Sequence, residues 1–94
     1  MFITGDKYEG EWLDGLRSGS GIYEFNNGDV FQGTWERGMR NGLGVHKFKN
    51  GARFEGRYVD NLKEGKGALY LTKEDIVIGE WKANVLVSVD GDTN

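Results

Sequence analysis

The strongest constraint on this chain is an internal repeat of 23 residues. The sequence YEGEW at 8–12 returns as FQGTW at 31–35, as FEGRY at 54–58 and as VIGEW at 77–81. Fifteen of the sixteen glycines fall into five columns with the same 23-residue step. A fixed period of this length is typical of proteins in which each repeat is a small unit stacked on the next. The repeat therefore predicts a linear, repetitive fold.

Within each repeat, larger apolar residues and glycines alternate with polar residues, as in Tyr8, Gly10 and Trp12. A period of two, with Trp, Tyr and Phe at the repeating positions, is typical of strands, and no segment shows the 3.6-residue period of a helix. Each repeat should contain two strands, at about 8–13 and 21–26 in the first, with Asn-Gly turns between repeats. We predict an all-β protein, a single-layer, open antiparallel meander of stacked two-strand hairpins.

The glycine and aromatic columns also predict how the strands pair. The loop around Asn27 and Gly28 should contain three or five residues, and the favoured register sets Phe25 opposite Phe31. A glycine would then face each indole and give it room, because paired side chains lie only about 4.5–5.5 Å apart. One predicted row alternates rings and glycines: Trp12, Gly21, Trp35, Gly44, Tyr58, Gly67 and Trp81. A second alternates Gly10, Tyr23, Gly33, His46, Gly56, Leu69 and Gly79, and a third is continuously apolar.

These motifs resemble the MORN (membrane occupation and recognition nexus) repeat. Its pattern is Y-x-G-x-W, a glycine-rich turn, and then G-x-G-x-Y-x-F ending in D/N-G. The first repeat, YEGEWLDGLRSGSGIYEFNNGD, fits nearly throughout, the second has His46 at an aromatic position, and the third has Leu69 and Leu71 there. The resemblance covers residues 2–82. It implies a scaffold that in some members holds a helical segment of a motor or cytoskeletal protein, and that in others is appended to lipid kinases or methyltransferases.

The repeat divides the chain into a MORN-repeat domain at 1–84 and a C-terminal capping strand and tail at 85–94. The predicted units of the domain are a half repeat at 2–7, repeats at 8–30, 31–53 and 54–76, and a partial repeat at 77–84. Val85, Val87 and Val89 alternate, so the last strand could cap the sheet or pair with its counterpart in a homodimer. A start in mid-repeat leaves open that the chain is a piece of a longer array.

The expected aromatic face has no predicted helix or second sheet to cover it. Each large ring offers about 150–250 Å² of surface, so several partly exposed rings exceed the apolar patch of an ordinary monomer. We expect an aromatic groove that binds a helix or an apolar peptide of a partner protein. The candidate partner-binding residues are Trp12, Tyr23, Trp35, His46, Tyr58 and Trp81. The alternative interpretation is that these rings are only structural.

The charge is unevenly distributed along the chain. Residues 37–66 carry eight Lys and Arg but only three Asp and Glu, although the whole chain has a net charge of −3. A net negative charge argues against nucleic-acid binding. The candidate anion- or lipid-binding residues are Lys47, Lys49, Arg53 and Arg57, which suit phosphoinositides or an anionic membrane. The alternative is a solvated face, shared with Glu9, Glu11, Glu55 and Glu80.

Residues that carry chemistry are scarce. The chain has no cysteine, and His46 is its one histidine, in the column of Tyr23 and Leu69. Neither a catalytic triad nor a metal site can be assembled from this set, so we expect no enzymatic activity, no metal and no cofactor. No apolar run approaches the roughly 18–20 residues of a membrane span. The expected location is the cytoplasm, with association to the cytoskeleton or to membranes as an option.

Overall fold

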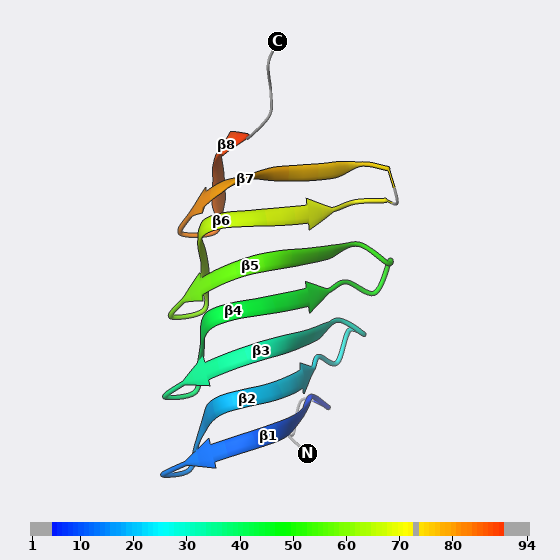
Figure 1. Ribbon diagram of the computed structural model, residues 1–94. Helices are drawn as coiled ribbons and strands as arrows, with labels where there is room; N and C mark the ends of the chain where they lie inside the picture. The colour runs from blue at the N-terminus through cyan, green and yellow to red at the C-terminus, as the bar shows by residue number, and fades with distance from the viewer. Residues whose placement is uncertain (1–4, 73, 90–94) are drawn as a thin grey trace.

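The computed structural model describes residues 5–72 and 74–89, which form one open antiparallel sheet (Figure 1). Its strands are β1 (Lys7–Leu13), β2 (Leu16–Glu24), β3 (Val30–Glu36), β4 (Met39–Lys47), β5 (Arg53–Val59), β6 (Leu62–Tyr70), β7 (Ile76–Lys82) and β8 (Val85–Val89). Each strand pairs with its sequence neighbours, in the order β1 to β8. The predicted fold class, a single-layer meander of stacked hairpins, is confirmed. Among the described residues, no helix is long and apolar enough to cross a membrane.

The tightest turns lie inside the repeats. β1 and β2 are joined by Asp14 and Gly15, which have φ angles of 53° and 79°. Two successive positive φ values match the right-handed twist of the flanking strands, and Asn, Asp and Gly tolerate them best. The second strand of the repeat therefore begins at Leu16. The predicted start of that strand, near residue 21, is wrong because the hairpin closes directly after β1.

Five residues separate β2 from β3, but Phe25 and Asp29 are still joined by a backbone hydrogen bond, so the loop itself has three residues, 26–28. The backbone N–H of Phe25 donates to the carbonyl of Asp29 at 2.9 Å, and that of Gly28 donates to the carbonyl of Phe25 at 3.0 Å. The strands therefore pair with Tyr23 opposite Phe31. The predicted register, with Phe25 opposite Phe31, required five loop residues and is wrong by two positions. Because the shift is even, the same side chains still share a face.

The corrected register replaces both predicted rows of alternating rings and glycines. One observed row consists only of glycines: Gly10, Gly21, Gly33, Gly44, Gly56, Gly67 and Gly79. The adjacent row is Tyr8, Tyr23, Phe31, His46, Phe54, Leu69 and Val77. A Cβ atom added to Gly33 would lie 2.9 Å from Cζ of Phe31. The glycines do make room for rings, but for those of the adjacent row.

Each repeat also contains a bend. Gly10 pairs with Gly21, but Trp12 pairs with Arg17, so β2 contains extra residues between these two pairs. Gly19 lies in this bulge with a φ angle of 68°, a conformation that glycine adopts without strain. Near the hairpin tips the even-numbered strands therefore turn steeply, as Figure 1 shows for β2, β4 and β6.

The hydrophobic core lies on one face of this bent sheet. Its most buried side chains are Phe31, Trp35, Phe54, Tyr58 and Trp81, with at most 6% of their surface exposed. They contact one another edge to face, for example Phe31 and Tyr58 with ring centroids 5.1 Å apart. The predicted half repeat at 2–7 begins outside the described residues, and the tail beyond residue 89 lies outside them as well.

Candidate binding face

Side chains of the sheet project to two opposite faces. We call the face that carries the rings and the glycine row the aromatic face, and the opposite one the outer face. On the aromatic face, a row near the hairpin tips is formed by four cross-strand pairs: Trp12 with Arg17, Trp35 with Arg40, Tyr58 with Lys63, and Trp81 with Leu86. Rings and cations therefore alternate along the first three pairs, and Leu86 takes the place of a cation in the fourth; we call this the ring–cation row.

The cations of this row lie close to the rings. The guanidinium carbon of Arg17 is 4.9 Å from the ring centroid of Trp35 and 5.1 Å from that of Tyr23. The guanidinium carbon of Arg40 is 5.2 Å from the centroid of Tyr58. Cations at such distances are attracted by the negative ring face. Arg17 and Arg40 thus each cover rings of their own repeat and of the next one, whereas Lys63 lies over Phe54 of its own repeat.

The same cations join successive hairpins. Nη2 of Arg17 donates to the carbonyl of Gly38 at 2.8 Å, and Nη2 of Arg40 donates to the carbonyl of Asn61 at 3.1 Å. In return, the backbone N–H groups of Gly38 and Asn61 donate to the carbonyls of Arg17 and Arg40, both at 3.0 Å. The tips of the second and third hairpins are therefore held by the repeat before them.

This packing changes the expected exposure of the candidate residues. Trp35, Tyr58 and Trp81 are buried, although the sequence predicted an uncovered row of rings. They lie between cations or other side chains on both sides, whereas Trp12, on the edge strand, has such a neighbour on one side and remains 51% exposed. Tyr23 is partly buried. The prediction of an open row is therefore wrong for the three central rings.

His46 is a packed ring of the aromatic face. Its centroid is 5.4 Å from that of Phe25 and 4.5 Å from that of Phe48. Its Nε2 atom lies 3.0 Å from Oδ2 of Asp29, and this hydrogen bond is the main cause that lowers the pKa of Asp29. The structure thus places His46 in the ladder of rings, as the sequence predicted.

The same pairing occurs one repeat earlier with different residues. The hydroxyl of Tyr23 donates to Oδ2 of Asp6 at 2.8 Å. In the repeat after that of Asp29 and His46, the two corresponding positions hold Ala52 and Leu69. Both polar partners are therefore replaced together by apolar residues. This agrees with the rule that a buried polar group needs a partner. The Asp–ring pairs are therefore structural parts of the repeat.

Burial changes the ionisation of the ring–cation row. It raises the pKa of Tyr58 to about 12, and the Tyr58 hydroxyl has no hydrogen-bond partner among the described residues. It is also the main cause that lowers the pKa of Arg40 and of Lys63, and a neighbouring cation lowers each of them further. The positive charges of Arg40 and Lys63 are thus partly shielded from solvent.

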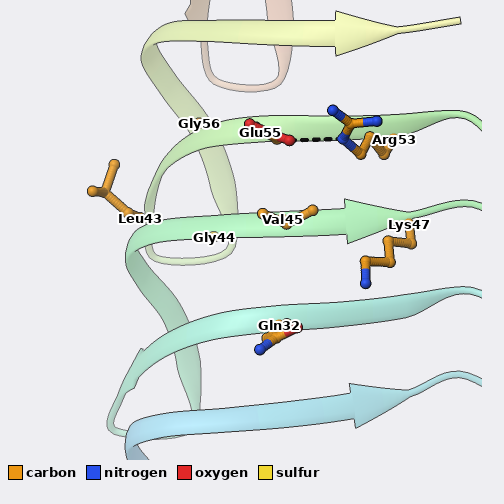
Figure 2. Close-up of a pocket in the computed structure, with 8 residues that line it drawn as sticks. All are labelled: Gln32, Leu43, Gly44, Val45, Lys47, Arg53, Glu55 and Gly56. Atoms are coloured by element: carbon orange, nitrogen blue, oxygen red, sulfur yellow. Dashed lines mark hydrogen bonds and ion pairs between the residues drawn. The ribbon is translucent and has the colours of Figure 1, made fainter. Parts of the chain in front are cut away.

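The outer face carries part of the predicted basic patch. Lys47 lies directly opposite Arg53, and both line a shallow hollow of about 550 Å³ (Figure 2). Nε of Arg53 donates to Oε2 of Glu55 at 2.7 Å, which offsets its charge. Arg57 is exposed next to Leu43, whereas Lys49 follows the end of β4 in the loop to β5. Of the four residues of the predicted anion- or lipid-binding patch, the structure therefore brings Lys47 and Arg53 together, with Arg57 nearby on the same face and Lys49 apart from them.

The comparison with known families agrees with this repeat structure. The model of the MORN repeat matches residues 8–30, 31–53 and 54–74, which is most of the chain. The chain belongs to the MORN repeat family. Among curated proteins, none gives a significant match. MORN repeats are non-catalytic modules that interact with proteins or membranes. In this MORN chain, β7 and β8 add a fourth hairpin after the matched residues.

Sequence reasoning missed the ring–cation row. The predicted strands at about 8–13 and 21–26 leave Arg17 and its equivalents Arg40 and Lys63 between strands, whereas the structure places all three on strands of the aromatic face. The signal was available, because the three residues follow one another at the 23-residue step of the MORN repeat. Within the described part of the chain, no group of three or more His, Cys, Asp or Glu residues could hold a metal ion.

Proposed function

We propose that this MORN chain is a non-catalytic scaffold whose aromatic face binds a segment of a partner protein. The observation that carries the proposal is that no second layer of the described residues covers this face. Trp12 is 51% exposed, and Tyr23, Phe25 and Phe48 are only partly buried. Exposed aromatic surface of this kind commonly marks an interaction site in a soluble protein.

The buried rings have a supporting role in this proposal. Trp35 and Tyr58 pack beneath the cations and hold the exposed rings in place. A surface that is rigid before binding loses less conformational freedom when the partner arrives. The contacts therefore involve Trp12, Tyr23 and His46, while Trp35, Tyr58 and Trp81 keep the face in shape.

The test is a capture experiment with paired variants. Trp12→Ala removes an exposed ring from the aromatic face, and Leu43→Ala removes a side chain that is 66% exposed on the outer face. We expect Trp12→Ala to lose specific partners and Leu43→Ala to retain them, with both variants melting near the wild-type temperature. Equal retention by both variants would contradict the proposal.

A second candidate function is association with an anionic membrane through the outer face. It is favoured by Lys47 and Arg57 on this face and by the exposed side chain of Leu43 beside them. A basic residue near an anionic surface contributes about 1 kcal/mol. Sedimentation with phosphatidylserine vesicles should then weaken as salt is raised, and equal binding to neutral vesicles would dismiss this function.

The predicted homodimer stays a prediction. β8 pairs with β7 on one side, and its other edge has no strand partner among the residues that the structure covers. Val85, Val87 and Val89 are exposed on it. Light scattering of the full chain and of a chain truncated after Asn84 distinguishes a cap from a dimer edge.

A further inference from the structure

The ring–cation row holds positive charge that the described chain does not neutralise. The two ion pairs in the described part of the chain are His46 with Asp29 and Arg53 with Glu55. None of the row's cations, Arg17, Arg40 and Lys63, has a carboxylate within ion-pair distance in that part. Partly buried cations usually have such a partner. Within the described part of the chain, no carboxylate therefore offsets the positive charge of the row.

The aromatic face has a small hollow beside two of these cations. A hollow of about 150 Å³ opens between Arg17 and Arg40, with Tyr23, Phe25 and Trp35 among its walls. Nη2 of Arg17 donates to the carbonyl of Gly38, and Nε and Nη2 of Arg40 both donate to Asn61, so the two guanidinium groups are held in fixed positions beside the hollow. A carboxylate can accept hydrogen bonds from such a pre-positioned fork while its carbon chain contacts the rings.

We propose that the ring–cation row binds an acidic α-helix of the partner protein, with Asp or Glu at every seventh position. This inference rests on the proposed function and names the chemistry of the partner. Arg17, Arg40 and Lys63 recur every two strands, so successive cations are about 9.6 Å apart. Seven residues of helix rise about 10.5 Å and return to nearly the same side.

An extended segment matches the row less well. Three residues of a strand span about 10 Å, but their side chains alternate between the two sides. Every second carboxylate would then point away from the cations. A helix instead presents all of its carboxylates to Arg17, Arg40 and Lys63 and lays apolar residues against the exposed ring of Trp12.

A membrane surface is the less favoured source of the anion. Arg17 and Arg40 are partly buried between rings and are tied to hairpin tips, so headgroups of a flat bilayer approach them poorly. The exposed cations lie on the outer face, where Arg57 is the clearest example. Vesicle binding is nevertheless included as an outcome of the test.

The probe is a synthetic helical peptide with glutamate at every seventh position, compared with the same peptide carrying glutamine there. Binding to the full chain is measured by tryptophan fluorescence and by calorimetry. We expect the glutamate peptide to bind about tenfold more tightly or better, because hydrogen bonds between charged groups are about twice as strong as neutral ones. Raised salt should reduce this difference.

Two variants with the same charge change locate the effect. Arg40→Gln removes a cation of the row, and Arg57→Gln removes an exposed cation of the outer face. Arg40→Gln should remove most of the preference for glutamate, and Arg57→Gln should leave it. If Arg40→Gln fails to fold, Lys63→Met serves instead, because it keeps an apolar stem beside Phe54 and loses the charge.

The outcomes separate this inference from the proposed function. Equal affinity for the two peptides, with loss of both in Trp12→Ala, would overturn the acidic specificity and leave the scaffold proposal intact. The absence of binding to either peptide, or an equal effect of Arg57→Gln, would also overturn it. Phosphatidylserine vesicles that bind wild type but not Arg40→Gln, without a preference for the glutamate peptide, would assign the row to lipid.

Discussion

Gly44→Ala is expected to destabilise the sheet strongly, because of a ring that lies against this glycine. The added Cβ would be 2.6 Å from Cε1 of Phe31, whereas ordinary contact begins at 3.4 Å. Phe31 cannot move away easily, because it is fully buried and packs edge to face on Trp35 and Tyr58. Overpacking of this kind costs about 1–3 kcal/mol, and we expect the upper end.

Thermal unfolding followed by circular dichroism measures this effect. For a domain of this size each kcal/mol lowers Tm by about 4–8 °C, so Gly44→Ala should melt roughly 10–20 °C below wild type. A second substitution, Phe31→Leu, removes the ring and should absorb most of the cost. The reasoning is refuted if Gly44→Ala melts within a few degrees of wild type. It is also refuted if Gly44→Ala lowers Tm by the same amount in the Phe31→Leu variant as in wild type.

Three further predictions concern rings of the ring–cation row. Tyr58→Phe should leave stability unchanged or raise it by about 1 kcal/mol, since the hydroxyl is buried without a partner in the described part of the chain; a clear loss in denaturant titration would show that a partner exists. The folded pKa of Tyr58, about 12, lies above the unfolded value of 10.0, so its contribution is fully present below pH 10 and is lost as the pH rises toward 12. Ultraviolet titration should show Tyr58 ionising last of the four tyrosines, as loss of the late step in Tyr58→Phe would identify, and simultaneous ionisation of all four would refute this. Trp35→Ala should cost about 3–5 kcal/mol because it empties a buried site, whereas Trp12→Ala should cost under about 1 kcal/mol; similar melting of the two variants would argue against the observed burial.

The fold class was predictable because the repeat and the period of two are both visible in the sequence. The register was not, because a change of two positions keeps every side chain on its face. Loops of three and of five residues around Asn27 and Gly28 satisfy the same alternation. What decides between them is the contact of the Phe31 ring with Gly33 and Gly44, which alternation alone does not show.

The rings of the candidate site were predicted from the sequence, but their burial was not. The rings were found from their columns, but their burial depends on long cations that reach across from a neighbouring strand. Lys and Arg are usually solvated, so the sequence alone does not indicate that Arg17, Arg40 and Lys63 pack against rings. The stacking of Arg17 on Trp35 and of Arg40 on Tyr58 follows from the bulge at Gly19 and its equivalent in the second repeat, which sets the local pairing.

The most direct test of the aromatic face as the binding surface is site-specific photo-crosslinking. A photoreactive residue replaces Trp12 on the aromatic face in one chain and Leu43 on the outer face in another. We predict that the probe at position 12 crosslinks a discrete protein partner and that the probe at position 43 does not. Crosslinks formed only from position 43, or the same set from both positions, would contradict the account.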